Sequence, residues 1–203
     1  MKILKYGYFG EDNAQQIFLE NYLAQLTIYL NFADKIAFER DGNFRLKGHD
    51  RPNVLKIFSE AIQIGLSHYQ QDIFFVGVDL DNESMDEHGK LFVQMIDKVI
   101  ADHKNRTFIF IPVQCIEHWL LYLKYKKEHP HSNKNESYER VARPDAKKRM
   151  YGFPRPVADK QAKIIAEFTQ NMEIEWLQNH SGSFQHFHSQ VIDFLKKADL
   201  ETA

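Results

Sequence analysis

Short apolar runs alternate with longer amphipathic stretches up to about residue 127 of the chain. The run at 72–78 is rich in Val, Ile and Phe, which is typical of a strand buried on both faces. Between Ala14 and Leu30, apolar residues recur instead at helical spacing. The same patterns predict strands at 3–9, 35–40, 72–78 and 107–112, a hairpin arm at 44–47, and helices at 14–30, 50–69, 85–103 and 114–127.

This alternation of strands and helices predicts an α/β fold, with a mostly parallel central sheet and helices on both faces. From residue 129 the chain becomes polar and then wholly helical in pattern, with predicted helices at 144–151, 156–171 and 184–198 and a loop at 179–183. We therefore expect an α/β core at 1–128 and, at 129–203, a basic loop and helical extension packed on it.

Composition narrows the classes of function only slightly. A chain of 203 residues favours one domain, and no apolar run approaches the roughly 20 residues that span a bilayer. No signal peptide is recognisable, and Cys115 is the only cysteine, so we expect a cytoplasmic protein without an intrachain disulfide. The net charge of -2 means that contact with a polyanion needs a local basic patch.

Acidic residues follow three of the predicted strands. Glu11 follows the first strand, Asp79 and Asp81 follow the strand at 72–78, and Glu117 lies just beyond the strand at 107–112. Because the carboxyl ends of parallel strands open onto one edge, these four acids can converge. Converging carboxylates repel one another unless a cation joins them, which favours a site for one or two Mg²⁺ or Mn²⁺ ions.

Other interpretations of Asp79 and Asp81 stay open at this point. They can be an N-cap and a turn residue without any chemistry. They also resemble the nucleophile motif of haloacid-dehalogenase-type phosphatases, although the later acids of that family are missing here. A receiver-like phosphoacceptor is a third interpretation, but it needs a lysine that the 107–112 strand does not supply.

The spacing of these acids resembles the Toprim pattern, and in particular the small RloB-like and OLD-family Toprim nucleases. The resemblance covers about residues 3–121 and rests on strand-Gly10-Glu11, on Asp79-Leu80-Asp81, and on Glu117-His118-Trp119-Leu120-Leu121. It implies metal-dependent phosphodiester chemistry, with Glu11 as acid-base or metal-binding residue, Asp79 and Asp81 as ligands, and Glu117 as an accessory acid. It also implies a catalytic lysine, best matched by Lys147 or Lys148. The first motif departs from the family because it reads Gly10-Glu11-Asp12-Asn13.

A basic segment follows the predicted α/β core. Between residues 121 and 160, eleven Lys and Arg residues stand against five Asp and Glu residues. Such a segment beside a metal-bearing edge can hold a nucleic-acid backbone, and a solvated charged surface explains it about as well. The candidate binding residues are Arg140, Arg143, Lys147, Lys148, Arg149 and Arg155.

Two further groups have simpler explanations. His180, His186 and His188 suggest zinc, but structural zinc sites commonly include cysteines, so we expect exposed histidines instead. Cys115 borders a buried strand and is expected to be a small core residue.

Taken together, the residues and the resemblance predict a Mg²⁺- or Mn²⁺-dependent nuclease acting on nucleic acid, in a phage-defence or restriction-linked system. The alternative is a non-catalytic Toprim-like interaction subunit, and the phosphatase is a weaker one. A protein partner in a defence module and a homodimer both remain open, and no membrane contact is expected.

Overall fold

A computed structural model describes residues 1–132, 134, 137–152 and 158–200. Its centre is a four-stranded parallel sheet of order β2-β1-β3-β4, which confirms the predicted α/β class. The strands are β1 (Lys2–Gly10), β2 (Ile36–Arg40), β3 (Ile73–Gly77) and β4 (Thr107–Phe110).

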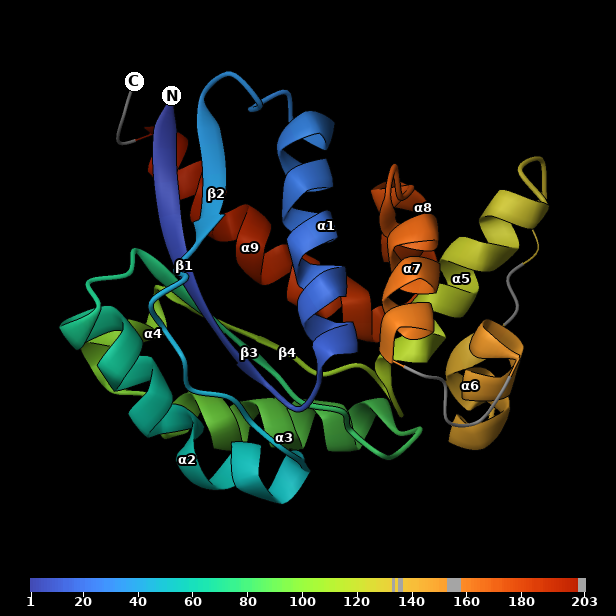
Figure 1. The fold of residues 1–203 in the computed structure, drawn as a ribbon, viewed down its shortest axis with the longest axis horizontal. Helices are drawn as coiled ribbons and strands as arrows, with labels where there is room; N and C mark the ends of the chain where they lie inside the picture. The colour runs from blue at the N-terminus through green and yellow to red at the C-terminus, as the bar shows by residue number, and fades with distance from the viewer. Residues whose placement is uncertain (133, 135–136, 153–157, 201–203) are drawn as a thin grey trace.

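Helices cover both faces of this sheet (Figure 1). The helices that connect the strands are α1 (Asn13–Tyr29), α2 (Arg51–Gln63) with the π-helical turn η1 (Ile64–His68), α3 (Met85–Asp97) and α4 (Ala101–Lys104). After β4 come α5 (Ile116–Glu128), the 3₁₀ turn η2 (Tyr138–Arg140), α6 (Arg143–Tyr151), α7 (Ala158–Thr169), α8 (Ile174–His180) and α9 (Gly182–Leu200).

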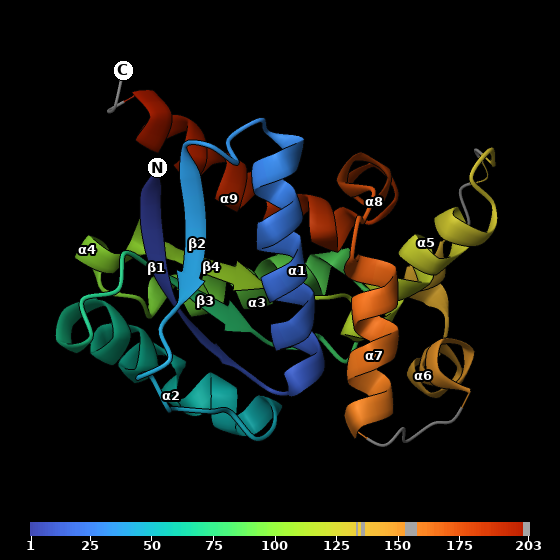
Figure 2. The same ribbon diagram turned by 45° about the horizontal axis from the view of Figure 1, so that its top comes forward.

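Two hydrophobic clusters follow from the alternation of side chains along the strands. Phe74 and Val76 of β3 pack with α2 and α3 on one face. Phe75 of β3 and Phe110 of β4 pack on the other face, with α1, α5 and α7–α9. The helix α9 runs along β4, where the ring of Phe187 lies 5.1 Å from that of Phe110. The C-terminal helices therefore share a core with the sheet (Figure 2).

Several predicted elements are wrong in detail. The segment 44–47 is not a hairpin arm, because it forms no strand and Phe44 is buried against Phe74 and Tyr69. The helix predicted at 85–103 breaks after Asp97, where buried Val99 turns the chain toward the core. The predicted loop at 179–183 is mostly helical, since only Ser181 separates α8 from α9.

The histidines of the C-terminal helices are also less exposed than predicted. His188 is buried, with its Nδ1 2.8 Å from the hydroxyl of Tyr22, and burial lowers the pKa of His188 to about 4. His180 stacks on Trp176 with ring centroids 3.5 Å apart, and His186 is half-buried. These rings belong to the aromatic core. Cys115, in contrast, is fully buried, as predicted.

No helix within the described part of the chain combines the length and the apolar character needed to cross a bilayer.

Candidate active site

Three strands of the sheet end at the same level. In the register of the sheet, Gly10 of β1 pairs with Gly77 of β3, and Gly77 pairs with Phe110 of β4. The segments that leave these ends therefore meet at one edge, which we call the acidic edge. It contains Glu11, Asp79, Asp81 and Glu117.

Asp79 lies at the centre of the acidic edge and is 2% exposed. Its Oδ1 accepts a hydrogen bond from Nε2 of Gln15 at 2.8 Å, and its Oδ2 accepts one from Nη2 of Arg143 at 3.2 Å. Its backbone N–H donates to Oε1 of Glu11 at 2.6 Å. Burial raises the pKa of Asp79 well above its usual range, the charges of Glu11, Asp12 and Glu117 raise it further, and Arg143 opposes them.

Glu11 and Asp12 have different roles although they are adjacent. Asp12 is the N-cap of α1, where its carboxylate accepts the backbone N–H of Gln15 at 3.0 Å. Glu11 turns toward β3 and accepts the Asp79 N–H. Its pKa is raised, first by burial and then by Asp12, against the opposing effects of that hydrogen bond and of Arg143 and Arg51. The Gly10-Glu11-Asp12 motif thus supplies one helix cap and one site acid.

Asp81 is held in the left-handed region, with φ of 56°, which aspartate tolerates better than most residues. Its backbone N–H donates to the carbonyl of Gln114 at 3.1 Å, which joins the loop after β3 to the loop after β4. The carboxylate pairs with Nη1 of Arg143 and lies 3.9 Å from Nη1 of Arg51. Arg143 therefore bridges Asp79 and Asp81.

Glu117 is the acid with the fewest partners at this edge. It lies in the first turn of α5 and is 1% exposed. Neither of its oxygens accepts a well-aligned hydrogen bond within the described residues, and its closest polar neighbours include the Cys115 thiol and the Tyr151 hydroxyl, whose pKa values it raises. The nearest cation is Nζ of Lys147, 3.9 Å from Oε1. A buried carboxylate without hydrogen bonds is costly, typically by at least about 1–3 kcal/mol, and such a group calls for an explanation.

The predicted basic residues divide into two sets. Arg143 and Lys147 reach the acidic edge from α6 and pair with its acids. Arg140, Lys148 and Arg149 are exposed, and none of them has an ion pair with a described residue. The remaining candidate, Arg155, lies outside the described residues.

Sequence reasoning missed two residues of this network, Gln15 and Arg51. Both lie in the first turn of a helix that follows a loop, on α1 and α2 respectively. Their positions within three residues of an N-cap aspartate are visible in the sequence, but glutamine and arginine are common at helix starts. Only the packing of α1 and α2 at the end of β1 brings them to the acids.

The four acids share one edge without forming a compact ligand cluster. Within the residues that the structure describes, no group of three or more His, Cys, Asp or Glu side chains is arranged to hold a metal ion. Arg143, Arg51 and Lys147 lie among the carboxylates and offset their charge. The donor chemistry nevertheless suits a hard cation, because all four side chains offer carboxylate oxygens and neither oxygen of Glu117 accepts a well-aligned hydrogen bond from a described residue.

A search with protein-family models and a search of curated proteins both return no match to this chain.

Proposed function

We propose that this protein is a Toprim-like, Mg²⁺- or Mn²⁺-dependent phosphodiesterase that cleaves nucleic acid at the acidic edge. The observation that carries the proposal is Glu117, a buried carboxylate that accepts no well-aligned hydrogen bond from a described residue and has one long ion pair with Lys147. Its charge also raises the pKa of Asp79. Burying a poorly partnered acid beside another buried acid costs the fold free energy. A divalent cation at this edge explains both.

The acids have distinct parts in this proposal. Asp79, Asp81 and Glu117 would hold the cation, and Glu11 would either join them or act as the acid-base group. A bound divalent cation polarises the scissile phosphate and generates hydroxide from water near neutral pH. Gln15 fixes the rotamer of Asp79 through the 2.8 Å hydrogen bond, which keeps one carboxylate oriented.

The basic residues of the edge complement a phosphodiester. Arg143, Arg51 and Lys147 pair with the acids in the structure. When a cation takes over the carboxylates, these side chains are released to bind phosphate oxygens, for which Arg offers a planar pair of donors. Lys147 is the better match for the catalytic lysine, because its Nζ lies at the edge whereas Lys148 is exposed.

One observation favours the second candidate, a non-catalytic interaction subunit with the same fold. Arg143 already pairs with both Asp79 and Asp81, so its positive charge offsets theirs without a metal ion. In that case the acidic edge is structural. The chain would then act through a partner, for which a defence or restriction-linked module is the context that the resemblance implies.

Charge-removing variants of equal size separate the two candidates. Glu11→Gln, Asp79→Asn and Asp81→Asn each keep an oxygen acceptor and remove one negative charge. Asp97→Asn is the matched control, since its side chain on α3 is 69% exposed and lies outside the acidic edge. Cleavage of labelled DNA and RNA would be followed with Mg²⁺ and with Mn²⁺, alongside thermal melts.

We expect metal-dependent cleavage by the wild type and by Asp97→Asn, and loss of cleavage in the other three variants while they remain folded. Wild-type protein that cleaves no DNA or RNA with either metal would contradict the nuclease and favour the interaction subunit. Cleavage that survives in Asp79→Asn would place the chemistry elsewhere.

A further inference from the structure

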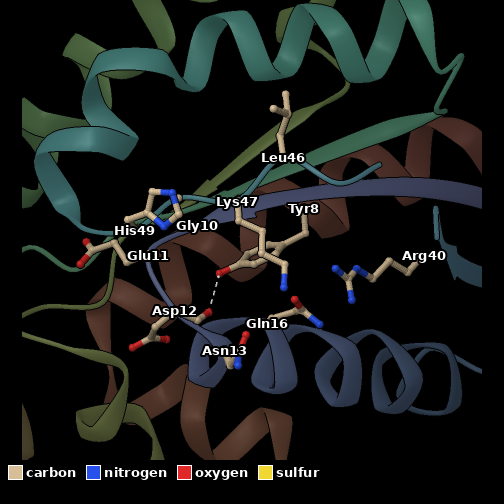
Figure 3. A pocket seen from close by; sticks show the side chains of 11 residues that line it. Tyr8, Gly10, Glu11, Asp12, Asn13, Gln16, Arg40, Leu46, Lys47 and His49 are labelled. Carbon is tan, nitrogen blue, oxygen red and sulfur yellow. Dashed lines mark hydrogen bonds between the residues drawn. The ribbon is translucent and has the colours of Figure 1, made fainter. Parts of the chain in front are cut away.

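A hollow with a volume of about 280 Å³ opens beside the acidic edge. We call it the flanking pocket. It lies between the end of β1, the first turns of α1 and the segment 46–49, and Glu11 is the acid that it shares with the acidic edge (Figure 3). Its walls carry the polar side chains of Asn13, Gln16, Arg40, Lys47 and His49, with Leu46 as an apolar contact.

The sequence builds one wall of this pocket through a close backbone approach. A Cβ atom at Gly48 would lie 2.5 Å from the carbonyl oxygen of Gly10 and 2.5 Å from Cγ2 of Val54, so only glycine fits there. The segment is also anchored at both ends, by buried Phe44 before it and by the Asp50 N-cap of α2 after it. Lys47 and His49 are therefore displayed from a fixed stretch of chain.

Charge is divided across the flanking pocket. The amine of Lys47 and the guanidinium of Arg40 point toward Gln16 on one side, and the carboxylates of Glu11 and Asp12 lie on the other (Figure 3). Lys47 is exposed and has no ion pair with a described residue. The pocket is thus basic away from the acidic edge and acidic next to it.

Arg40 is positioned while it keeps donors for a ligand. Glu20 accepts a hydrogen bond from Nη1 of Arg40 at 3.3 Å and another from Nε2 of Gln16 at 2.9 Å, so one carboxylate orients both side chains. Arginine has five N–H donors, and it can pair with Glu20 and a ligand oxygen together. Gln16 still has its carbonyl oxygen to accept a hydrogen bond from a base or sugar.

We propose that the flanking pocket binds the phosphate of the nucleotide next to the scissile phosphodiester, through Lys47, His49 and Arg40. This inference rests on the proposed function, because the acidic edge would hold the scissile phosphate through its cation. A nucleic-acid strand that crosses the acidic edge and the flanking pocket would place one phosphate at the bound cation and the next phosphate at the basic side chains. The regularly spaced phosphates of a nucleic-acid backbone match two neighbouring anion sites, whereas a single small anion would use only one of them.

Binding measured without metal tests the pocket separately from cleavage. A short fluorescent single strand of DNA, and RNA of the same sequence, would be titrated with full-length protein in EDTA at several salt concentrations. The test variant is Lys47→Ala. The matched control is Arg45→Ala, which removes one positive charge from an exposed residue, just before the segment 46–49, that does not line the pocket.

We expect Lys47→Ala to weaken binding about tenfold, as for one lost charge-assisted hydrogen bond, and to make the slope of log affinity against log salt shallower by about 0.7. Arg45→Ala should bind like the wild type. Gly48→Ala adds a Cβ atom that collides with the Gly10 carbonyl oxygen, so it should displace the segment and weaken binding as well. A thermal melt checks that this variant folds.

Equal nucleic-acid affinities of Lys47→Ala and Arg45→Ala would overturn the proposal that the flanking pocket binds a phosphate, whether or not the protein cleaves nucleic acid. So would a wild type that binds neither strand in EDTA. Loss of binding in Lys47→Ala together with a wild type that never cleaves would support the pocket and count against the nuclease.

Discussion

Two buried aspartates, Asp41 and Asp79, follow strands of the same sheet and differ in almost everything else. Each is 2% exposed. Burial opposes ionisation of Asp41, but hydrogen bonds from Gln71, Asn43 and Lys5 outweigh it and lower the pKa of Asp41. Burial raises the pKa of Asp79, and the acids around it add to the effect. Burial of an acid after a strand therefore does not by itself indicate a site.

The register of the sheet explains the difference. The last residue of β2, Arg40, pairs with Tyr6, four residues before the end of β1 at Gly10. Asp41 therefore lies partway along β1, where Gln71 donates to its Oδ2 at 3.0 Å. Asp79 lies where β1, β3 and β4 end together. Only the position of Asp79, where three strands end, brings further acids close to it.

The largest expected effect concerns activity. Asp79→Asn should lower metal-dependent cleavage at least about 10³-fold, because it removes a proposed cation ligand and its charge. Asp41→Asn should leave the rate of cleavage within a few-fold of wild type at a temperature where it is folded. Initial rates on one labelled substrate measure both, and equal losses in the two variants would break the comparison.

Glu117→Gln should weaken Mn²⁺ affinity by roughly 10–100-fold, as expected for loss of an outer or accessory ligand. The substitution keeps the size of the buried side chain but removes its charge. Calorimetric titration of folded protein measures the affinity. Unchanged affinity would mean that the buried carboxylate serves only its ion pair with Lys147.

Asp41→Asn should lower the free energy of unfolding by about 1–3 kcal/mol, because the new amide places a donor against the donors of Gln71 and Lys5. Asp79→Asn removes a charge that burial disfavours and should cost less than Asp41→Asn, although it also weakens the pair with Arg143. Urea unfolding at neutral pH without metal compares them. The reverse order would contradict the assignment of Asp41 as the structural acid.

The two acids should also give stability opposite dependences on pH. The stabilisation due to Asp41 is present above the carboxyl pKa of the unfolded chain, about 4, and is lost as the pH falls through the lowered pKa. The pKa of Asp79 is raised, so its stabilisation is present below the carboxyl pKa of the unfolded chain and is lost as the pH rises through the raised pKa. The stability difference between wild type and Asp79→Asn should therefore shrink or reverse on going from pH ~4 to pH ~8.

Urea unfolding of both asparagine variants between about pH 3 and pH 8 measures these differences. The difference between wild type and Asp41→Asn should shrink on acidification instead. Differences that change in the same direction for both variants would show that the two environments are not distinct.

Much of the fold could be predicted because its signals are local. Buried β3 is a continuous apolar run, Asp12 and Asp50 cap the helices that they precede, and Gly152 ends α6 with a positive φ, as its sequence suggests. The break after Asp97 could not be predicted in this way. It depends on where Val99 meets the core, which is a tertiary contact.

The candidate site was predictable only as a set of acids at strand ends. Pattern reasoning identified Glu11, Asp79 and Asp81, but it has no means of placing Gln15 or Arg51, which arrive through helix packing. It also named Arg143 and Lys147 among the candidate nucleic-acid-binding residues of the basic segment, and in the structure both pair with the acids. The basic side of the flanking pocket comes from residues 40–49, where no charge cluster stands out in the sequence.

A calorimetric titration of Mn²⁺ into metal-free protein tests the central claim most directly, with Asp79→Asn and Asp41→Asn as the paired variants. We predict that the wild type binds the ion, that Asp41→Asn binds it with similar affinity, and that Asp79→Asn shows no binding heat. A wild type without a site, or equal binding by Asp79→Asn, would contradict the assignment of the acidic edge as a metal-dependent active site.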